Sequence, residues 1–269
     1  QKYAGFPVIV KNLFTSDMLR FKGFHSNPLR FGGYLSTICI IAFSFGVFYS
    51  RKAFYFFPIL FYGLLINASR TYWFSAIVTI FIISFLKDKK HFIIIFLSIL
   101  IFLIIFFKTS EQYKARIYKA IDNTKNLSHM QLRKNFWQAG IRIFLENPIL
   151  GVGDGKVGNY LKPYYEKRVI NNITHCHSIY ITMLAETGVI GFSILLWLLI
   201  HFIKKYFDEF KKEKDSFFKA FAISLFGSFI NLAISGFMEH NLATFVIWGF
   251  LSFYMGVYES FKNSTRNLQ

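Results

Sequence analysis

Acidic residues are scarce in this chain of 269 residues, which has 14 aspartates and glutamates against 31 lysines and arginines. The formal charge of +17 leaves nucleic acid open as a partner, although lysine and arginine also accumulate in the cytoplasmic loops of membrane proteins. With only two cysteines, Cys39 and Cys176, a disulfide framework is not expected. No glycine-rich loop is followed by Lys-Ser or Lys-Thr, which excludes a P-loop nucleotide site.

Apolar residues, in contrast, are abundant: 54% of the chain is hydrophobic, 20% is aromatic, and the mean hydropathy is +0.40. Soluble domains are rarely so apolar, so the composition indicates a polytopic membrane protein. A spanning helix needs roughly 20 apolar residues. We therefore expect an all-α bundle of about seven spans, near residues 31–49, 53–68, 71–86, 91–107, 178–203, 216–236 and 242–259.

Basic residues favour one orientation of this bundle. Four segments that the alternation of spans places on one side are basic: 51–52, 87–90, 204–215 and the tail after 259. By the positive-inside rule this side is the cytoplasm. Four parts follow: an external segment over 1–30 with a short helix near 8–20, a four-helix membrane region over 31–107, a large basic external loop over 108–176, and a three-helix membrane region over 177–269. The Ser69-Arg70 and 239–241 turns also fall outside.

The long loop has twelve lysines and arginines against five aspartates and glutamates. Its surplus of positive charge fits either lipid headgroups or a surface that binds anionic phosphates. Residues 129–146 predict an amphipathic helix that ends at Asn147-Pro148, because apolar residues recur at helical spacing. These are Leu132, Phe136, Ile143 and Phe144. The following glycines, Gly151 to Gly155, are interpreted as a tight turn or, alternatively, as a phosphate cradle.

The chain re-enters the membrane through His175-Cys-His177. A helix from His177 to Ile203 would be about 40 Å long against a hydrocarbon core of about 30 Å, so His177 is expected above the hydrocarbon. Thr187-Gly188 predicts a kink. On a straight helix His177, Gly188 and Gly191 would share one face suited to close helix packing. Glu186 would lie nearly opposite, buried and paired, unless a break in the helix lets it orient His177.

The spacing His177-Ser178, nine residues, Gly188-Val-Ile-Gly191 resembles the signature of O-antigen ligases. Further segments resemble motifs of the wider O-antigen ligase and polymerase superfamily: Arg133…Trp137…Asn147-Pro148…Gly151-Val-Gly153, Ser69-Arg70 at a helix start, and Arg20-x-x-Gly23…Asn27-Pro28. Members have about twelve spans, so the chain corresponds to a C-terminal portion. No signal peptide is recognisable, and a fragment or processed product is expected because the sequence starts at Gln1 without a methionine.

This resemblance implies a GT-C-like glycosyltransferase of the bacterial inner membrane, with a large helical periplasmic loop and its active site on the periplasmic face. It would transfer a glycan from an undecaprenyl diphosphate carrier to a sugar of lipid A–core, without a metal or other cofactor. The implied partners are this donor, this acceptor, membrane lipids and polysaccharide assembly proteins, and not nucleic acid.

The residue types suit that chemistry. A sugar hydroxyl needs a base poised near neutral pH, and imidazole, whose pKa is ordinarily about 6.5, fits, so His177 is the expected general base. Guanidinium groups bind phosphate oxygens in a bidentate way, which makes Arg70 and Arg133 the expected ligands of the diphosphate. Arg20 and Arg116 are lesser candidates. One displacement at the anomeric carbon would invert its configuration. Glu186, Gly188 and Gly191 are expected to support the site.

Other interpretations stay open at this point. His175 and His177 form an HxH pair that could ligate a metal, and Arg70 could anchor to headgroups. Within the superfamily, a polysaccharide polymerase or a protein O-oligosaccharyltransferase would use the same donor. A transporter of anionic lipid-linked glycans would also require external arginines. It should in addition have charged residues at mid-membrane and paired repeats, whereas the expected spans are almost free of charge and no repeat is recognisable. A structural subunit is the remaining alternative.

Overall fold

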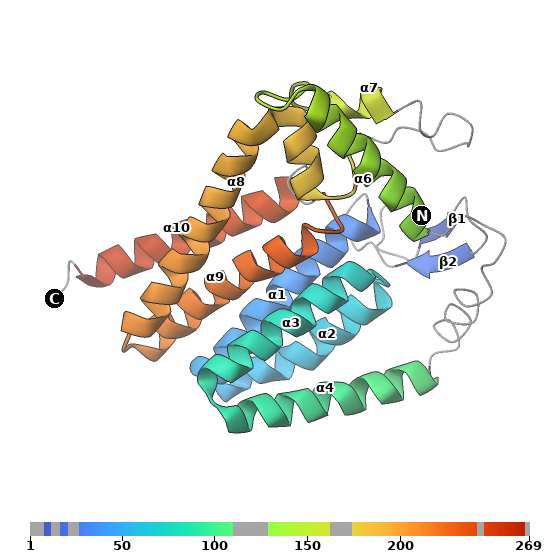
Figure 1. Ribbon diagram of the computed structural model, residues 1–269. Coiled ribbons are helices and arrows are strands. Elements are labelled where there is room, and N and C mark those ends of the chain that lie inside the picture. Colours follow the sequence, from blue (N-terminus) through green and yellow to red (C-terminus); the bar gives the residue numbers. More distant parts are fainter. Residues whose placement is uncertain are drawn as a thin grey trace.

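The computed structural model of the protein describes residues 8–11, 17–20, 27–109, 129–161, 174–240 and 245–266. Most of these residues are helical and form one elongated bundle (Figure 1). In order, the helices are α1 (Pro28–Phe48), a 3-10 turn η1 (Arg51–Tyr55), α2 (Phe56–Ile66), α3 (Arg70–Lys87), α4 (Lys89–Thr109), α6 (His129–Glu146), α7 (Val157–Leu161), α8 (Ile179–Lys212), α9 (Ser216–Ser235) and α10 (Phe245–Arg266). The expected helical bundle is confirmed.

Five of these helices, α1, α3, α4, α8 and α9, are long and apolar enough to cross a membrane. The protein is therefore an integral membrane protein. All seven expected spans are helical, although α8 and α10 continue nine and seven residues beyond their expected ends. Helices α2 and α10 do not reach the length and hydropathy of the other five. Helix α2 has 11 residues, about 17 Å of helix, which is less than the hydrocarbon thickness. Helix α10 has 22 residues, but its C-terminal half carries Glu259, Lys262 and Arg266.

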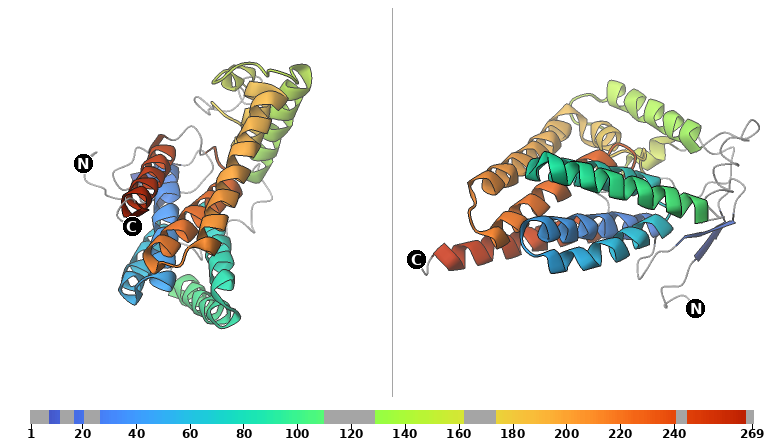
Figure 2. Two further views of the ribbon diagram at one scale, coloured as in Figure 1. Left: turned by 90° about the vertical axis from the view of Figure 1, so that its left-hand side faces the viewer. Right: turned by 90° about the horizontal axis from the view of Figure 1, so that it is seen from below.

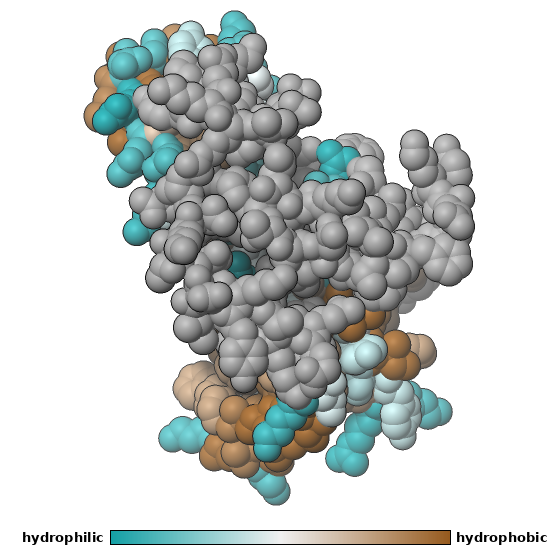
Figure 3. Space-filling model, turned by 90° about the vertical axis from the view of Figure 1, so that its right-hand side faces the viewer, coloured by the Kyte–Doolittle hydropathy of each residue, from teal (hydrophilic) through white to brown (hydrophobic). Residues whose placement is uncertain are grey.

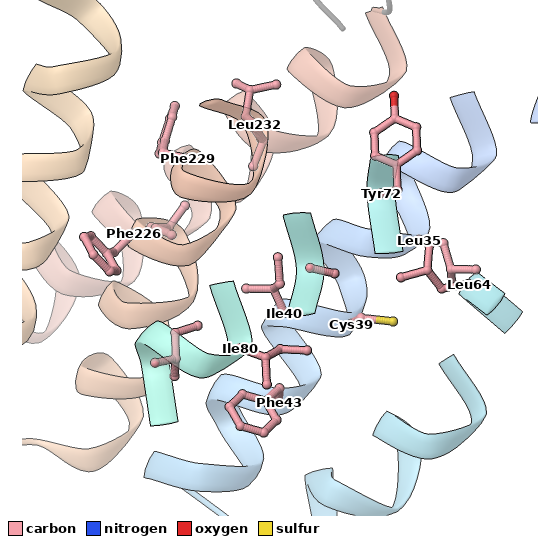
Figure 4. Close-up of a cluster of buried hydrophobic side chains, with 14 of the residues drawn as sticks. Leu35, Cys39, Ile40, Phe43, Leu64, Tyr72, Ile80, Phe226, Phe229 and Leu232 are labelled. Atoms are coloured by element: carbon pink, nitrogen blue, oxygen red, sulfur yellow. The ribbon is translucent and has the colours of Figure 1, made fainter. Parts of the chain in front are cut away.

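Helix α9 lies at the centre of the bundle and packs against α1, α3 and α8. Figure 4 shows part of this core, with Ile40 and Phe43 of α1 beside Ile80 of α3. On the other side of α9, the rings of Phe226 and Phe229 lie against Phe207 and Phe202 of α8, with centroids 5.2 and 5.0 Å apart. Gly227 lets α9 approach these helices closely, since a β-carbon there would lie 2.7 Å from Ile83 and 2.9 Å from Ile40. Small residues at such contacts are the usual means of packing helices in a membrane.

The N-terminal segment differs from the expectation. The helix predicted near 8–20 is wrong, because β1 (Val8–Lys11) and β2 (Asp17–Arg20) form an antiparallel pair in which Val8 lies opposite Arg20. The run Val8-Ile9-Val10 explains the difference, since β-branched side chains favour an extended backbone.

Helix caps fix where the first and third helices begin. Pro28 occupies the first turn of α1, and the Asn27 side chain accepts a hydrogen bond of 2.8 Å from the Leu29 amide, a favourable arrangement for a helix start. Before α3, Ala68 adopts a left-handed conformation with φ of 62° and Ser69 becomes the N-cap. Arg70 is consequently the first helical residue, at the end of the bundle that carries α6.

Helix α4 lies at the margin of the bundle. Both views of Figure 2 place it on the outside, and only 11% of its most apolar stretch is buried. Figure 3 shows apolar side chains gathered on the lower part of the surface, where α4 lies in Figure 1. This helix therefore presents most of its side chains to the outside of the bundle.

Candidate functional site

The candidate site lies where α6, the start of α3, the start of α8 and the end of α9 meet (Figure 1). His177 precedes α8 rather than beginning it. Its backbone is left-handed, with φ of 55°, and Ser178 is the N-cap, whose hydroxyl accepts from the Ile181 amide at 3.5 Å. The helix predicted to begin at His177 therefore begins two residues later, because a serine hydroxyl satisfies a free amide of the first turn.

Helix α8 is broken at Gly188, where φ is 62° and ψ is −163°. The kink predicted at Thr187-Gly188 is confirmed. The break and the start after His177 together make the predicted common face of His177, Gly188 and Gly191 wrong, since no continuous helix connects the three residues.

A turn formed by residues 148–153 docks onto the broken helix. The Val152 amide donates to the Ala185 carbonyl at 3.0 Å, and the Gly153 amide donates to the Glu186 carbonyl at 2.8 Å. Beyond the break, the Val189 amide donates to the Pro148 carbonyl at 2.8 Å. The turn thus supplies hydrogen-bond partners to the backbone groups that the break leaves open, which a membrane environment requires.

Glycine is required on both sides of this contact. A β-carbon on Gly188 would lie 2.2 Å from the Ile149 carbonyl oxygen, and one on Gly151 would lie 2.3 Å from the Glu186 carbonyl carbon. Both glycines also have positive φ, a conformation that costs other residues about 1 kcal/mol or more. Gly191 acts differently: a β-carbon there would meet the Thr187 hydroxyl at 2.1 Å.

Glu186 is buried and bonded to the loop, as one of the two interpretations predicted. Its carboxylate accepts from the Val157 amide at 3.4 Å, and the Gly155 amide is also a hydrogen-bond partner. The amides of the glycine-rich segment are therefore used by Glu186 and by the α8 backbone. Because the amides of Val152, Gly153 and Gly155 already have protein acceptors, the structure favours the tight turn over a phosphate cradle.

Three histidines form a compact group beside this structure. The His177 amide donates to Nδ1 of His175 at 3.1 Å, and the two rings lie 4.6 Å apart between centroids. The His175 ring stacks on His240 at 5.0 Å, and the His177 ring lies 5.9 Å from Phe136 of α6. His240 follows α9, so segments that are distant in sequence meet here.

Burial and charge keep two of these imidazoles neutral. Burial, reinforced by the positive charge of Arg133, lowers the pKa of His175 to about 4. Burial and the neighbouring His175 lower the pKa of His240 to about 4. Both rings are consequently unprotonated at neutral pH, which agrees with Nδ1 of His175 accepting a hydrogen bond.

Arg133 lies in the same cluster and is held by a carboxylate. Its guanidinium donates to Oε1 of Glu239 at 2.8 Å, and the same oxygen accepts from the Thr71 hydroxyl at 3.4 Å. The Glu239 side chain is 5% exposed, whereas that of Arg133 is 25% exposed. Tyr72 lies within electrostatic reach of both groups, and its hydroxyl points away from the apolar core in Figure 4. Arg133 thus combines a fixed position with access from outside.

The other expected arginines differ in position and in how much of them the structure describes. Arg70 is exposed and adjoins Thr71, at the same end of the bundle as Arg133. Arg20 belongs to β2, but its side chain is outside what the structure describes, as is all of Arg116. Within the described ranges, no group of three or more His, Cys, Asp or Glu side chains is arranged to hold a metal ion.

Glu239, His240 and Thr71 are site residues that the sequence did not assign. The expected topology did place the 239–241 turn on the same side as the long loop. It offered one signal, because Glu239 is an acidic residue in a short turn facing a basic loop. Its partner could not be identified, since the pair joins positions 106 residues apart.

Two backbone-directed bonds tie the segments of the site together. The Ile179 amide donates to the Gly236 carbonyl at 2.8 Å, and the Tyr180 hydroxyl donates to the Ala233 carbonyl at 2.7 Å. The start of α8 is therefore attached to the end of α9, which carries Glu239 and His240 into the site.

Replacing Gly188 with alanine should destabilise the protein, because the substitution adds a clash with the Ile149 backbone to the cost of a positive φ. We expect a loss of about 2–4 kcal/mol and exposure of the 148–157 segment to protease. Gly155→Ala is the matched control, since Gly155 has a φ of 67° and nothing within 4 Å of its missing side chain. Thermal unfolding of both purified variants measures the difference, and equal losses would contradict this role of Gly188.

The stability of the protein should fall as the pH is lowered from about 6.5 to about 4. In this window the unfolded chain binds protons at His175 and His240 while the folded chain does not, so each histidine favours unfolding by up to roughly 3 kcal/mol at the acid end. His240→Phe keeps a stacking ring and should reduce this pH dependence by about half. The exposed His201, changed to phenylalanine, serves as control. Thermal midpoints at several pH values give the measurement, and identical slopes in all three proteins would refute the assignment.

A comparison with known protein families identifies the family to which the chain belongs. No curated protein matches the chain. The family model described as O-antigen ligase matches residues 54–196, which is more than half of the chain and includes Arg70, Arg133, His177 and the two glycines of the predicted signature. The matched range ends before Glu239 and His240. On this match, the expected family is confirmed, and the chain is an integral membrane protein that belongs to the O-antigen ligase family.

Proposed function

We propose that this protein is a metal-independent, inverting glycosyltransferase of the inner membrane, with its site on the periplasmic face. The donor is a glycan on undecaprenyl diphosphate, and the acceptor is a sugar hydroxyl of lipid A–core. The family supports an enzyme of the ligase or polymerase type acting on lipid-linked glycans in general. The single observation that carries the finer proposal is the grouping of His177 with Arg133 at one end of the bundle.

His177 is the proposed general base. Its amide is fixed by His175 and its ring lies against Phe136, so the loop before α8 holds the imidazole in one place. The residue as a whole is partly exposed, and a substrate hydroxyl would approach it from that side. A positioned base of this kind contributes typically 10²- to 10⁴-fold to the rate of a proton transfer.

Arg133 is the proposed ligand of the donor diphosphate, with Arg70 as a second cation and Arg20 and Arg116 as lesser candidates. The Glu239 carboxylate already binds the Arg133 guanidinium, which shows that this group accepts an oxyanion in its present position. One quarter of the side chain is exposed, and phosphate oxygens would bind there to part of the five N–H groups that guanidinium offers in a planar fork.

The proposed reaction is a single displacement. The acceptor hydroxyl transfers its proton to His177 as its oxygen attacks the anomeric carbon. The bond from this carbon to the diphosphate oxygen breaks, and undecaprenyl diphosphate leaves with both electrons of the bond. The arginines stabilise the negative charge that develops on the leaving group, as electrostatic catalysis requires. Glu186, Gly188 and Gly191 act indirectly by fixing the helix break beside the base.

His177→Ala should lower the turnover of glycan transfer by about 10²- to 10⁴-fold, because the acceptor hydroxyl loses its base. The affinity for the lipid-linked donor should change little. The measurement is release of the carrier lipid with lipid A–core, with growing polysaccharide or with protein as acceptor, which also distinguishes a ligase from a polymerase or a protein O-oligosaccharyltransferase. His201→Ala, an exposed histidine further along α8, is the control. Near-normal turnover in His177→Ala would refute the role of the base.

Arg133→Gln should reduce kcat/KM by about tenfold to a hundredfold, as expected for the loss of charge-assisted hydrogen bonds. Arg142→Gln is the matched control, since Arg142 is an exposed arginine of the same helix. The double variant Arg133→Gln/Glu239→Gln separates two causes. If Arg133 binds the diphosphate, the double variant stays as slow as Arg133→Gln. Recovery of activity in the double variant would instead show that Arg133 serves only to neutralise Glu239.

A further inference from the structure

A cavity lies at the opposite end of the bundle from the histidines. Its volume is about 930 Å³, and it is bounded by the end of α1, by η1, by α2 and by the first half of α4. This volume is in the upper part of the roughly 300–1,000 Å³ range that is typical of ligand-binding pockets. We refer to it as the α2–α4 crevice. It is separate from the proposed transfer site, and it does not depend on the proposed function.

The α2–α4 crevice is closed at one end and apolar inside. Towards the end of the bundle that carries the histidines, α2 and α4 are joined by Phe61 and Phe102, whose ring centroids are 5.8 Å apart, and by Tyr62 and Phe106 at 6.3 Å. Below these aromatic pairs, residues of both helices line the cavity, and α4 packs mainly on α3. The inner wall includes Phe57 and other apolar side chains. This apolar lining is suited to an acyl chain.

The other end of the crevice carries positive charge. Arg51, Lys87 and His91 line it, and Arg51 and Lys87 are exposed at the surface of the bundle. The Lys87 ammonium group lies 4.9 Å above the ring of Phe48, which holds it at the mouth. Among the described residues that line the crevice none is acidic, although Asp88 beside it binds the His91 ring at 2.7 Å.

We propose that the α2–α4 crevice binds one anionic phospholipid, with its phosphate at Arg51 and Lys87 and an acyl chain between α2 and α4. Both halves of the crevice fit this ligand, and a free phosphate would leave the apolar slot unused. The charged mouth lies at the end that the basic loops predict to be cytoplasmic, and basic pockets between helices on that side are suited to anionic headgroups. The lipid completes the support of α4, which is otherwise attached mainly through α3.

Native mass spectrometry of the purified protein tests this proposal. The probes are phosphatidylglycerol, phosphatidylethanolamine with the same acyl chains, and glycerol phosphate, which has the headgroup charge without the chains. We expect the wild-type protein to retain phosphatidylglycerol in preference to the other two. Each removed cation should weaken retention roughly fivefold, so Arg51→Gln/Lys87→Gln should weaken it by about 25-fold. Lys52→Gln/Lys89→Gln removes the same charge from neighbouring exposed positions outside the crevice and should weaken it far less.

A second pair of variants tests the apolar half with every cation present. Ser98 lines the crevice, whereas its neighbour Leu97 is exposed outside it. Ser98→Phe should fill the slot and abolish selective retention, and Leu97→Phe should leave it unchanged. Gel filtration and helical circular dichroism establish that each variant is folded. The proposal is overturned if phosphatidylglycerol and phosphatidylethanolamine are retained equally, if no lipid is retained, if glycerol phosphate binds as well as the lipid, or if the two members of either pair behave alike.

Discussion

The docking of the 148–153 turn onto the broken α8 is the contact on which the functional end of the molecule depends. A helix that breaks in or near a membrane leaves amides and carbonyls without partners, and each such group costs several kcal/mol in an apolar environment. Here the turn after α6 satisfies carbonyls before the break and amides after it. These hydrogen bonds join backbone groups, which every residue has. The contact therefore depends on the sequence mainly through the glycines, which allow the two backbones to approach closely. Helix α6 is thereby fixed to α8, and Arg133 is brought beside the histidine loop.

The charge of Arg133 has two effects in this arrangement. It forms the ion pair with Glu239, and it also disfavours a proton on the neighbouring His175. Burial is the larger cause of the lowered pKa of His175, and the positive charge of Arg133 adds to it. Burial acts in the same direction on His240. A cluster built from neutral imidazoles and one clamped guanidinium is coherent for a reaction in which a proton is removed at one point and negative charge develops at another.

The membrane helices were predictable because each is a long apolar run, and α6 was predictable because its apolar residues recur at helical spacing. The kink at Gly188 was predictable from glycine itself. The start of α8 was misjudged because hydropathy alone does not register that Ser178 can cap a helix and leave His177 outside it. The strands β1 and β2 were missed because a short segment has no strong period, and the β-branched run Val8-Ile9-Val10 was the only local signal.

The contacts between side chains of distant segments could not be predicted from the sequence, for a different physical reason. The Arg133–Glu239 pair depends on where α6 and the end of α9 come to lie, and neither segment specifies the other. The histidine stack of His175 and His240 is of the same kind. The family motif identified His177 and the glycines because their spacing lies within one continuous segment.

The attachment of Ile179 to Gly236 has a mechanical consequence. The first turn of α8 is hydrogen-bonded to the last residues of α9. A tilt of α9 would therefore carry the histidine loop and the Glu239 turn in the same direction. Arg133, on α6, is bound to Glu239 by the ion pair and would be carried along with that turn. Helix α9 is also the most enclosed spanning helix of the bundle. The imidazole of His177 and the guanidinium of Arg133 thus belong to one mechanical unit, so a tilt of α9 would displace both groups together and change the distance between them little.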